Sequence, residues 1–213
     1  SKNINQMQEK VIAGFNVSCV GDNRSYSYLP SRNGKTLSDK VAKHILKWID
    51  PDYVAYSWSE RGSDERQYCA PGVDLPIASI MRTKYGKYPE YHTSLDDLIN
   101  VVTPDGLEGG YEALRLSIEA IENNCYPRIT VLGEPQLGKR GLYPTISTKG
   151  SASETRLLKE LITWSDGNHS LLEIAEKCNT PIWELYPLIK KLRTHDLLVL
   201  EGERVDGVSI SEF

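Results

Sequence analysis

The sequence predicts an α/β domain, made of a sheet with covering helices, followed by a small winged-helix domain. In the first half, apolar and β-branched segments alternate with helical patterns, which is the order that gives such a sheet. After residue 150, three short helical patterns precede an apolar strand and a Gly-containing turn, the order of a winged helix. We therefore expect the first domain at 1–125, an extended connector at 126–150 and the winged helix at 151–213.

The first domain begins with an expected strand and an expected helix. Residues 11–20 are apolar and β-branched and stop at Gly21-Asp22-Asn23, so they predict a buried strand that ends in a loop, with Asp22 at its carboxyl end. Between residues 34 and 49, Thr36 or Ser38 can cap a helix. Its apolar positions recur at helical spacing, at Leu37, Val41, Ile45 and Trp48.

Two further strands and a long helix complete this domain. Residues 53–58 and 75–81 are short apolar segments that predict strands, and a polar, Gly-containing stretch separates them. Residues 107–121 place apolar side chains on one face and acidic ones elsewhere, which predicts a helix that covers the sheet.

The second domain follows a segment that is rich in Pro and Gly and has little periodicity, which favours an extended connector. Helices are expected at 155–164, 170–178 and 181–195, and a hairpin is expected from Leu197–Leu200 through 201–203 to Val205. Pro187 falls inside the third helix, so that helix either bends there or begins later than its pattern indicates.

Composition excludes some classes of protein. The net charge of −4 and a pI near 5.6 give no basic surface for nucleic acid. No apolar run is long enough to span a bilayer, so we expect no membrane partner. The four cysteines are far apart and form no Cys-x-x-Cys pair, which is typical of reduced thiols and favours a cytoplasmic location.

The most informative segment for chemistry is Pro-Glu-Tyr-His-Thr-Ser-Leu-Asp-Asp at 89–97. It lies between an expected strand and the long helix, where α/β enzymes place their active loops. His92 in such a loop can bind a metal through one ring nitrogen. On residue type alone, a loop histidine is more often an ordinary surface residue than a ligand.

Several motifs resemble those of a known family. Tyr91-His92-Thr93 with Asp96, followed by Val-Thr-Pro-Asp-Gly-Leu at 102–107, is similar to the last metal-binding segment of the two-zinc aminopeptidases. Gly-Ser-Asp-Glu-Arg-Gln at 62–67 and Glu-Pro-Gln-Leu-Gly-Lys-Arg-Gly-Leu-Tyr-Pro at 134–144 resemble a bacterial aminopeptidase-like subfamily associated with polysaccharide biosynthesis. The resemblance spans nearly the whole chain and implies a phosphorylase/hydrolase-like sheet-and-helix fold.

The resemblance also implies a metal site. His92 matches a histidine that binds one of two zinc ions, and Asp22 matches an acidic ligand. Tyr91 matches a tyrosine that hydrogen-bonds the oxyanion formed during hydrolysis, a role open to a neutral phenol. Simple packing is the alternative for Tyr91.

The same comparison implies a substrate pocket for a peptide-like or amide small molecule. Asp64 and Glu65 would line it, although the family more often has Asp followed by His at these positions. Arg66 and Arg82 could receive a substrate carboxylate through paired N–H groups, with surface solvation as the alternative for each.

Two segments of the family's site have no counterpart here. There is no His-x-Asp segment that could provide a bridging Asp, and no Glu-Glu pair that could provide the general base. Both come before the strand of Asp22 in the family's order. We therefore expect an incomplete aminopeptidase-like domain, a fragment inactive alone, whose intact protein is a zinc-dependent hydrolase of peptide or amide bonds.

The alternative is a non-catalytic scaffold or regulatory protein that uses its winged helix for assembly or for DNA. Lys190, Lys191 and Arg193 lie on the third expected helix of that domain, which is the DNA-reading helix in winged-helix proteins. Acidic residues outnumber basic ones across 151–205, so DNA binding is not favoured. Trp183 and Tyr186 instead suggest docking on the first domain or on a second subunit, which would make a homo-oligomer.

Overall fold

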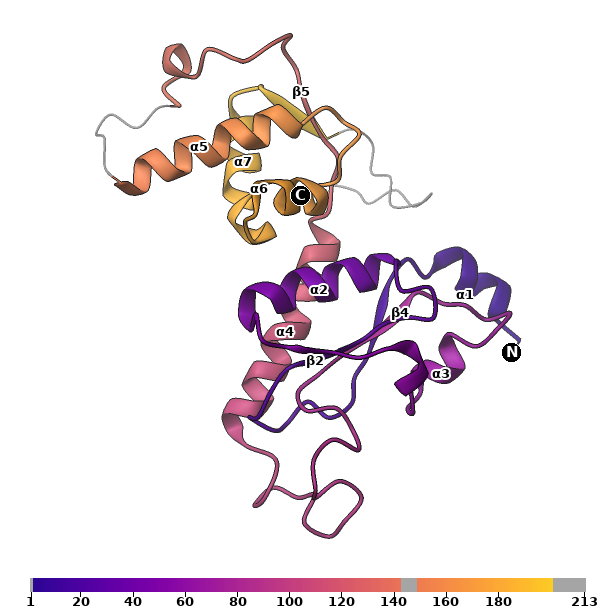
Figure 1. The fold of residues 1–213 in the computed structure, drawn as a ribbon. Coiled ribbons are helices and arrows are strands. Elements are labelled where there is room, and N and C mark those ends of the chain that lie inside the picture. Colours follow the sequence, from indigo (N-terminus) through magenta and orange to yellow (C-terminus); the bar gives the residue numbers. More distant parts are fainter. Residues whose placement is uncertain (1, 143–148, 201–213) are drawn as a thin grey trace. The chain divides into compact units, whose positions relative to one another are not determined.

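The computed structural model describes residues 2–142 and 149–200. The chain divides into two units, Ser1–Glu122 and Asn123–Phe213 (Figure 1). No helix in the described part of the chain is long and apolar enough to cross a bilayer.

The first unit is built on a mixed four-stranded sheet with the order β1-β4-β2-β3. β1 (Gly14–Asn16) runs parallel to β4 (Ile77–Met81), and β4 pairs antiparallel with β2 (Ser27–Leu29). β3 (Val54–Ala55) lies parallel to β2 at the edge of the sheet. The helices of this unit are α1 (Ile4–Lys10), α2 (Leu37–Ile49), α3 (Glu65–Tyr68) and α4 (Pro104–Glu122), with a 3₁₀ turn, η1, at Trp58–Glu60.

Successive side chains of each strand point to opposite faces of the sheet, so the core is divided between the two faces. Tyr28 and Ile80 belong to one cluster, which contains Ala42 and Leu46 of α2 and Ala113 of α4. The side chains next to them in sequence, Leu29 and Met81, belong to a second cluster. The second cluster contains Tyr85 and is joined by partly buried Cys19, Tyr56, Trp58 and Tyr91. The two helices therefore pack on one face, and the loop with Tyr91 packs on the other.

The covering helix α2 forms where its capping signal predicts. Thr36 accepts a hydrogen bond from the backbone N–H of Asp39, and the Asp39 carboxylate accepts one from the backbone N–H of Thr36. The same carboxylate accepts bonds from the hydroxyls of Tyr28 at 2.7 Å and Ser31 at 2.6 Å. The cap of α2 is thus also the anchor that ties this helix to β2.

Helix α4 approaches the segment that follows β1 very closely. A Cβ atom at Gly106 would overlap the backbone carbonyl of Gly21, and one at Gly110 would overlap that of Val20. Glycine at these two helix positions therefore lets the backbone of α4 lie directly on the segment that leads to Asp22.

Three elements of the first unit differ from the sequence prediction. The strand expected at 11–20 covers only Gly14–Asn16, and that expected at 53–58 covers only Val54–Ala55. Helix α4 begins at Pro104 rather than 107. β2 and α3, by contrast, fall in segments for which the pattern gives no regular element.

The described residues of the second unit form three α-helices and a two-stranded sheet. α5 (Lys149–Trp164) contacts α6 (Leu171–Cys178), and a 3₁₀ turn, η3 (Ile182–Glu184), leads into α7 (Tyr186–Thr194). A capping box between Ser170 and Glu173 fixes the start of α6. The core of this unit consists of fully buried aliphatic side chains, among them Leu158, Leu161, Ile174 and Leu192.

Residues 126–150 are not simply an extended connector. β5 (Pro127–Ile129) pairs antiparallel with β6 (Leu198–Leu200), and a 3₁₀ turn, η2, forms at Leu137–Arg140. The division between the units consequently falls after Glu122, not near 150. Periodicity within the segment could not indicate this, because the partner of β5 lies far away in the sequence.

The third helix of this unit starts later than 181. Pro187 lies in the first turn of α7, where the missing N–H costs no intrahelical bond, so it begins the helix rather than bending it. β6 confirms a strand at 198–200, while the hairpin expected across 201–205 lies outside the described residues.

Candidate functional site

The candidate site is the loop that follows β4, at residues 82–103. It is a succession of turns with no regular helix or strand. Arg24 holds it through paired bonds of 2.8 and 2.9 Å to the carboxylate of Glu90. Tyr88 donates a 3.1 Å bond to Asp96, and Thr93 donates a 2.7 Å bond to the carbonyl of Glu90. These bonds fix the path of the loop on both sides of His92.

His92 is exposed and has a positive φ of 59°. Its ring stacks on that of Tyr91, with centroids 4.0 Å apart and planes inclined by 17°. Tyr91 in turn makes an edge contact with Tyr88, whose centroid is 5.6 Å away. A left-handed backbone is costly for a residue other than glycine and is often found at functional sites. The turn therefore presents the imidazole to solvent on a base of packed aromatic rings.

Asp22 is placed at the carboxyl end of the same sheet but is engaged by protein donors. It is only 3% exposed. Its carboxylate accepts bonds from the N–H and hydroxyl of Thr83 at 2.7 and 2.6 Å, and from the N–H of Arg24 at 3.0 Å. These bonds join the loop after β1 to the end of β4, which is a structural role.

Glu65 does not face a pocket. It is fully buried, and its oxygens accept bonds from the N–H groups of Gly62 and Ser63, the amide of Asn16 and the phenol of Tyr85. Burial raises the pKa of this carboxyl, but the hydrogen bonds together lower it by more. The pKa therefore lies below its usual value. The expectation that Glu65 contacts substrate stays a prediction, and the burial of the carboxylate does not favour it.

Arg82 is also buried, at 5% exposed, rather than solvated at the surface. Its guanidinium donates to the carbonyl of Asp22 at 2.8 Å and to the side chain of Asn23 at 3.0 Å, and lies 3.8 Å from the ring centroid of Tyr26. The interpretation as a receptor for a substrate carboxylate does not fit this packing. Asp64 and Arg66, in contrast, are exposed next to Glu65.

One residue of the loop was not expected from the sequence to contribute to the site. Lys84 is 5% exposed and lies over the rings of Tyr85 at 3.9 Å and Tyr56 at 5.3 Å. Burial lowers the pKa of its ammonium group, and the charge of Lys87 lowers it further. The signal available in the sequence was its position, three residues beyond an apolar strand and seven before Tyr91.

The described residues do not form a complete zinc site. Among them, no three His, Cys, Asp or Glu side chains are grouped so that they could hold a metal ion. Asp22 and His92 as a pair of ligands therefore stay a prediction, and the engagement of the Asp22 carboxylate with Thr83 does not favour it.

Comparison with known families identifies the first unit. Residues 1–124 match the family described as a domain of unknown function, DUF4910. This chain belongs to the DUF4910 family. Residues 124–200 of this DUF4910 protein match a winged helix-turn-helix family, in agreement with the three helices and strand of the second unit.

Two relatives from Clostridium acetobutylicum extend the comparison. One, provisionally named a polysaccharide biosynthesis protein with an aminopeptidase-like domain, is 38% identical over 169 residues, which cover 77% of this chain and 38% of the relative. The other is the crystal structure of a protein provisionally named a peptidase, with 31% identity and a TM-score of 0.82 over 94% of this chain and 44% of the other. This DUF4910 chain thus spans less than half the length of either relative.

Proposed function

We propose that this chain is part of a zinc-dependent hydrolase of peptide or amide bonds, and that the loop at 82–103 forms one side of the active site. The observation that carries the proposal is the turn at His92, where an exposed imidazole with a left-handed backbone is supported by the ring of Tyr91. The names of the two Clostridium relatives support a peptidase-like activity.

In this proposal His92 supplies one zinc ligand, and the other ligands come from residues outside this chain. Zinc would supply the polarisation of the scissile carbonyl. Tyr91 is the candidate for a hydrogen bond to the developing oxyanion, since its ring is adjacent to that of His92 and is partly exposed.

Of the four residues predicted to line the pocket, the proposal keeps Asp64 and Arg66, whose side chains are exposed. Glu65 and Arg82 become positioning residues. Glu65 holds the backbone that carries Asp64, and Arg82 holds the backbone of Asp22.

The test is metal analysis and hydrolysis by the full-length protein. Wild-type protein is expected to contain zinc and to release the amine from aminoacyl-p-nitroanilides. His92→Ala is expected to weaken zinc binding by at least about 100-fold and to abolish turnover, because loss of even a supporting residue of a metal site costs about 10- to 100-fold. His169→Ala, in the second unit, is the matched control and should behave as wild type. Full-length protein that holds no zinc, or retention of zinc by His92→Ala, would overturn the proposal.

A non-catalytic role is the competing candidate. It is favoured by the finding that Asp22, Glu65 and Arg82 all direct their charges to other parts of the protein. Under this alternative the full-length protein neither holds zinc nor hydrolyses amides, so the same measurement separates the two.

A further inference from the structure

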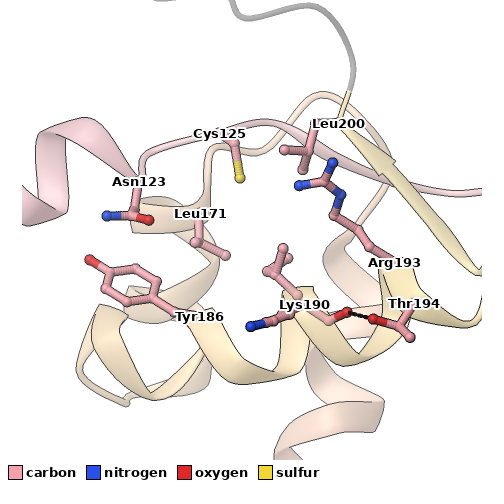
Figure 2. Close-up of a pocket in the computed structure, with 9 residues that line it drawn as sticks. Asn123, Cys125, Leu171, Tyr186, Lys190, Arg193, Thr194 and Leu200 are labelled. Atoms are coloured by element: carbon pink, nitrogen blue, oxygen red, sulfur yellow. Dashed lines mark hydrogen bonds between the residues drawn. The ribbon is translucent and has the colours of Figure 1, made fainter. Parts of the chain in front are cut away.

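The second unit contains a half-open cavity of about 540 Å³ that no part of the proposed hydrolase uses (Figure 2). One wall is a single face of α7, made by residues at helical spacing. The opposite wall comes from the segment before β5, the start of α6 and the end of β6. The lining residues are Asn123, Cys125, Leu171, Tyr186, Ile189, Lys190, Arg193, Thr194 and Leu200.

Most of the cavity lining is apolar. Leu171, Ile189 and Leu200 contribute aliphatic side chains, and Tyr186 contributes an aromatic ring. Burial raises the pKa of the Cys125 thiol to about 11, so this side chain is uncharged near neutral pH. A volume of 300–1,000 Å³ and a mostly apolar lining are typical of small-molecule sites.

The charged part of the cavity is purely cationic. Lys190 and Arg193 are exposed on α7, and no Asp or Glu is among the lining residues. Within the part of the chain that the structure describes, neither side chain makes a hydrogen bond or an ion pair. Their neighbour Lys191, which does not line the cavity, pairs with Glu154 at 3.0 Å. The two cations on the cavity side of α7 are thus available to an anion, and the third cation of this helix is not.

We propose that this cavity binds a small organic acid, with its apolar body against Leu171, Ile189 and Leu200 and its carboxylate at Arg193, while the charge of Lys190 also attracts the anion. A guanidinium binds a carboxylate through two parallel hydrogen bonds, and a lysine adds a second positive charge. In Figure 2 the guanidinium of Arg193 lies beside Leu200, and the side chain of Lys190 lies on α7 on the side of Tyr186. A helix that reads DNA must project into a groove. The cation-bearing face of α7 instead borders a concave surface, which favours a small ligand.

Calorimetric titration of the complete 213-residue chain with decanoate tests the proposal. Decanoate is expected to bind, and decanol, which has the same chain without the charge, is expected to bind at least about tenfold more weakly. The double variant Lys190→Gln with Arg193→Gln should weaken decanoate binding by about 10- to 100-fold, since hydrogen bonds to charged groups are stronger than those between neutral groups. The matched control is Arg156→Gln, an exposed cation of α5 outside the cavity, which should bind as wild type does.

Amide NMR shifts locate the ligand independently of the variants. Decanoate should move the resonances of α7 and of Cys125, and leave those of β4 unchanged. Absence of binding up to millimolar decanoate, equal binding of decanol, or undiminished binding by the folded double variant would each overturn the proposal.

Discussion

The phenol of Tyr85 donates a 2.7 Å hydrogen bond to the Oε1 atom of Glu65, and both groups are buried. This bond joins the loop after β4 to the first residue of α3. Burial raises the pKa of the Tyr85 phenol, and the bond to Glu65 raises it further, so the phenol keeps its proton and stays a donor. The loop that carries His92 therefore depends on a residue that lies far from it in sequence.

Replacing Tyr85 with Phe should destabilise the protein by about 1–3 kcal/mol, because the change leaves a buried carboxylate oxygen with one donor fewer. Urea unfolding of the complete chain measures this as a shift of the midpoint. Tyr111→Phe, at a tyrosine that is 63% exposed, is the matched control and should be neutral. Equal midpoints for the two variants would show that the buried bond contributes nothing.

Stability should fall in acid because of Glu65. Its pKa in the folded protein lies below the unfolded value of about 4.3, so folding favours the charged form. The stabilisation is complete at pH values above the pKa of Glu65 in the unfolded protein. It is lost as the pH falls through the pKa of Glu65 in the folded protein. Urea midpoints measured from pH 7 to pH 3 should decline steeply in wild type and less so in Glu65→Gln. The exposed Glu108→Gln should follow wild type, and a Glu65→Gln curve parallel to wild type would contradict the assignment.

Replacing Gly106 with Ala should destabilise the first unit, although alanine favours a helix. The added Cβ would overlap the carbonyl of Gly21, and overpacking of this kind costs about 3 kcal/mol. The gain in helix propensity is about 1 kcal/mol, so the net loss is about 2 kcal/mol. Thermal unfolding measures the change, with Glu108→Ala in the same helix as the control. A rise in melting temperature would show that α4 can shift away from Gly21 at little cost.

The complete chain is not expected to bind duplex DNA at a salt concentration of about 0.15 M. Its net charge is −4, and Lys191 is paired with Glu154. Fluorescence anisotropy with a labelled duplex checks this. Binding that weakens steeply with salt and is lost in the Lys190 and Arg193 double variant would assign these cations to phosphate contacts instead.

The sequence predicted the elements whose signals are local. α2 was recognised because both of its signals are local: Thr36 caps the helix, and a regular apolar spacing lies within it. β2 was missed because it has only 3 residues and is defined by partners at Val54 and Met81. The strand expected at 11–20 proved shorter for a related reason, since its partner β4 pairs with it only at 77–79.

The same contrast between local signals and distant partners applies to the candidate site. The loop of His92 was predicted because it follows an apolar strand and precedes a long helix. The burial of Glu65 and Arg82 could not be predicted, since it depends on Asn16, Tyr85 and Tyr26, which come together only in the fold. A charged side chain next to a candidate motif therefore indicates the neighbourhood of a site better than it indicates contact with substrate.

The pairing of β5 with β6 sets an order of events during synthesis of the protein. The ladder joins Pro127 to Leu200, so it links the first strand of the second unit to its last described strand. Bringing together segments so far apart in sequence costs loop-closure entropy and slows folding. On the ribosome, the side of β5 that pairs with β6 must wait with unpaired backbone groups until β6 has left the exit tunnel, whereas its other side can already bond to residues 165–167. The nascent second unit should therefore become resistant to protease only after residue 200 has emerged.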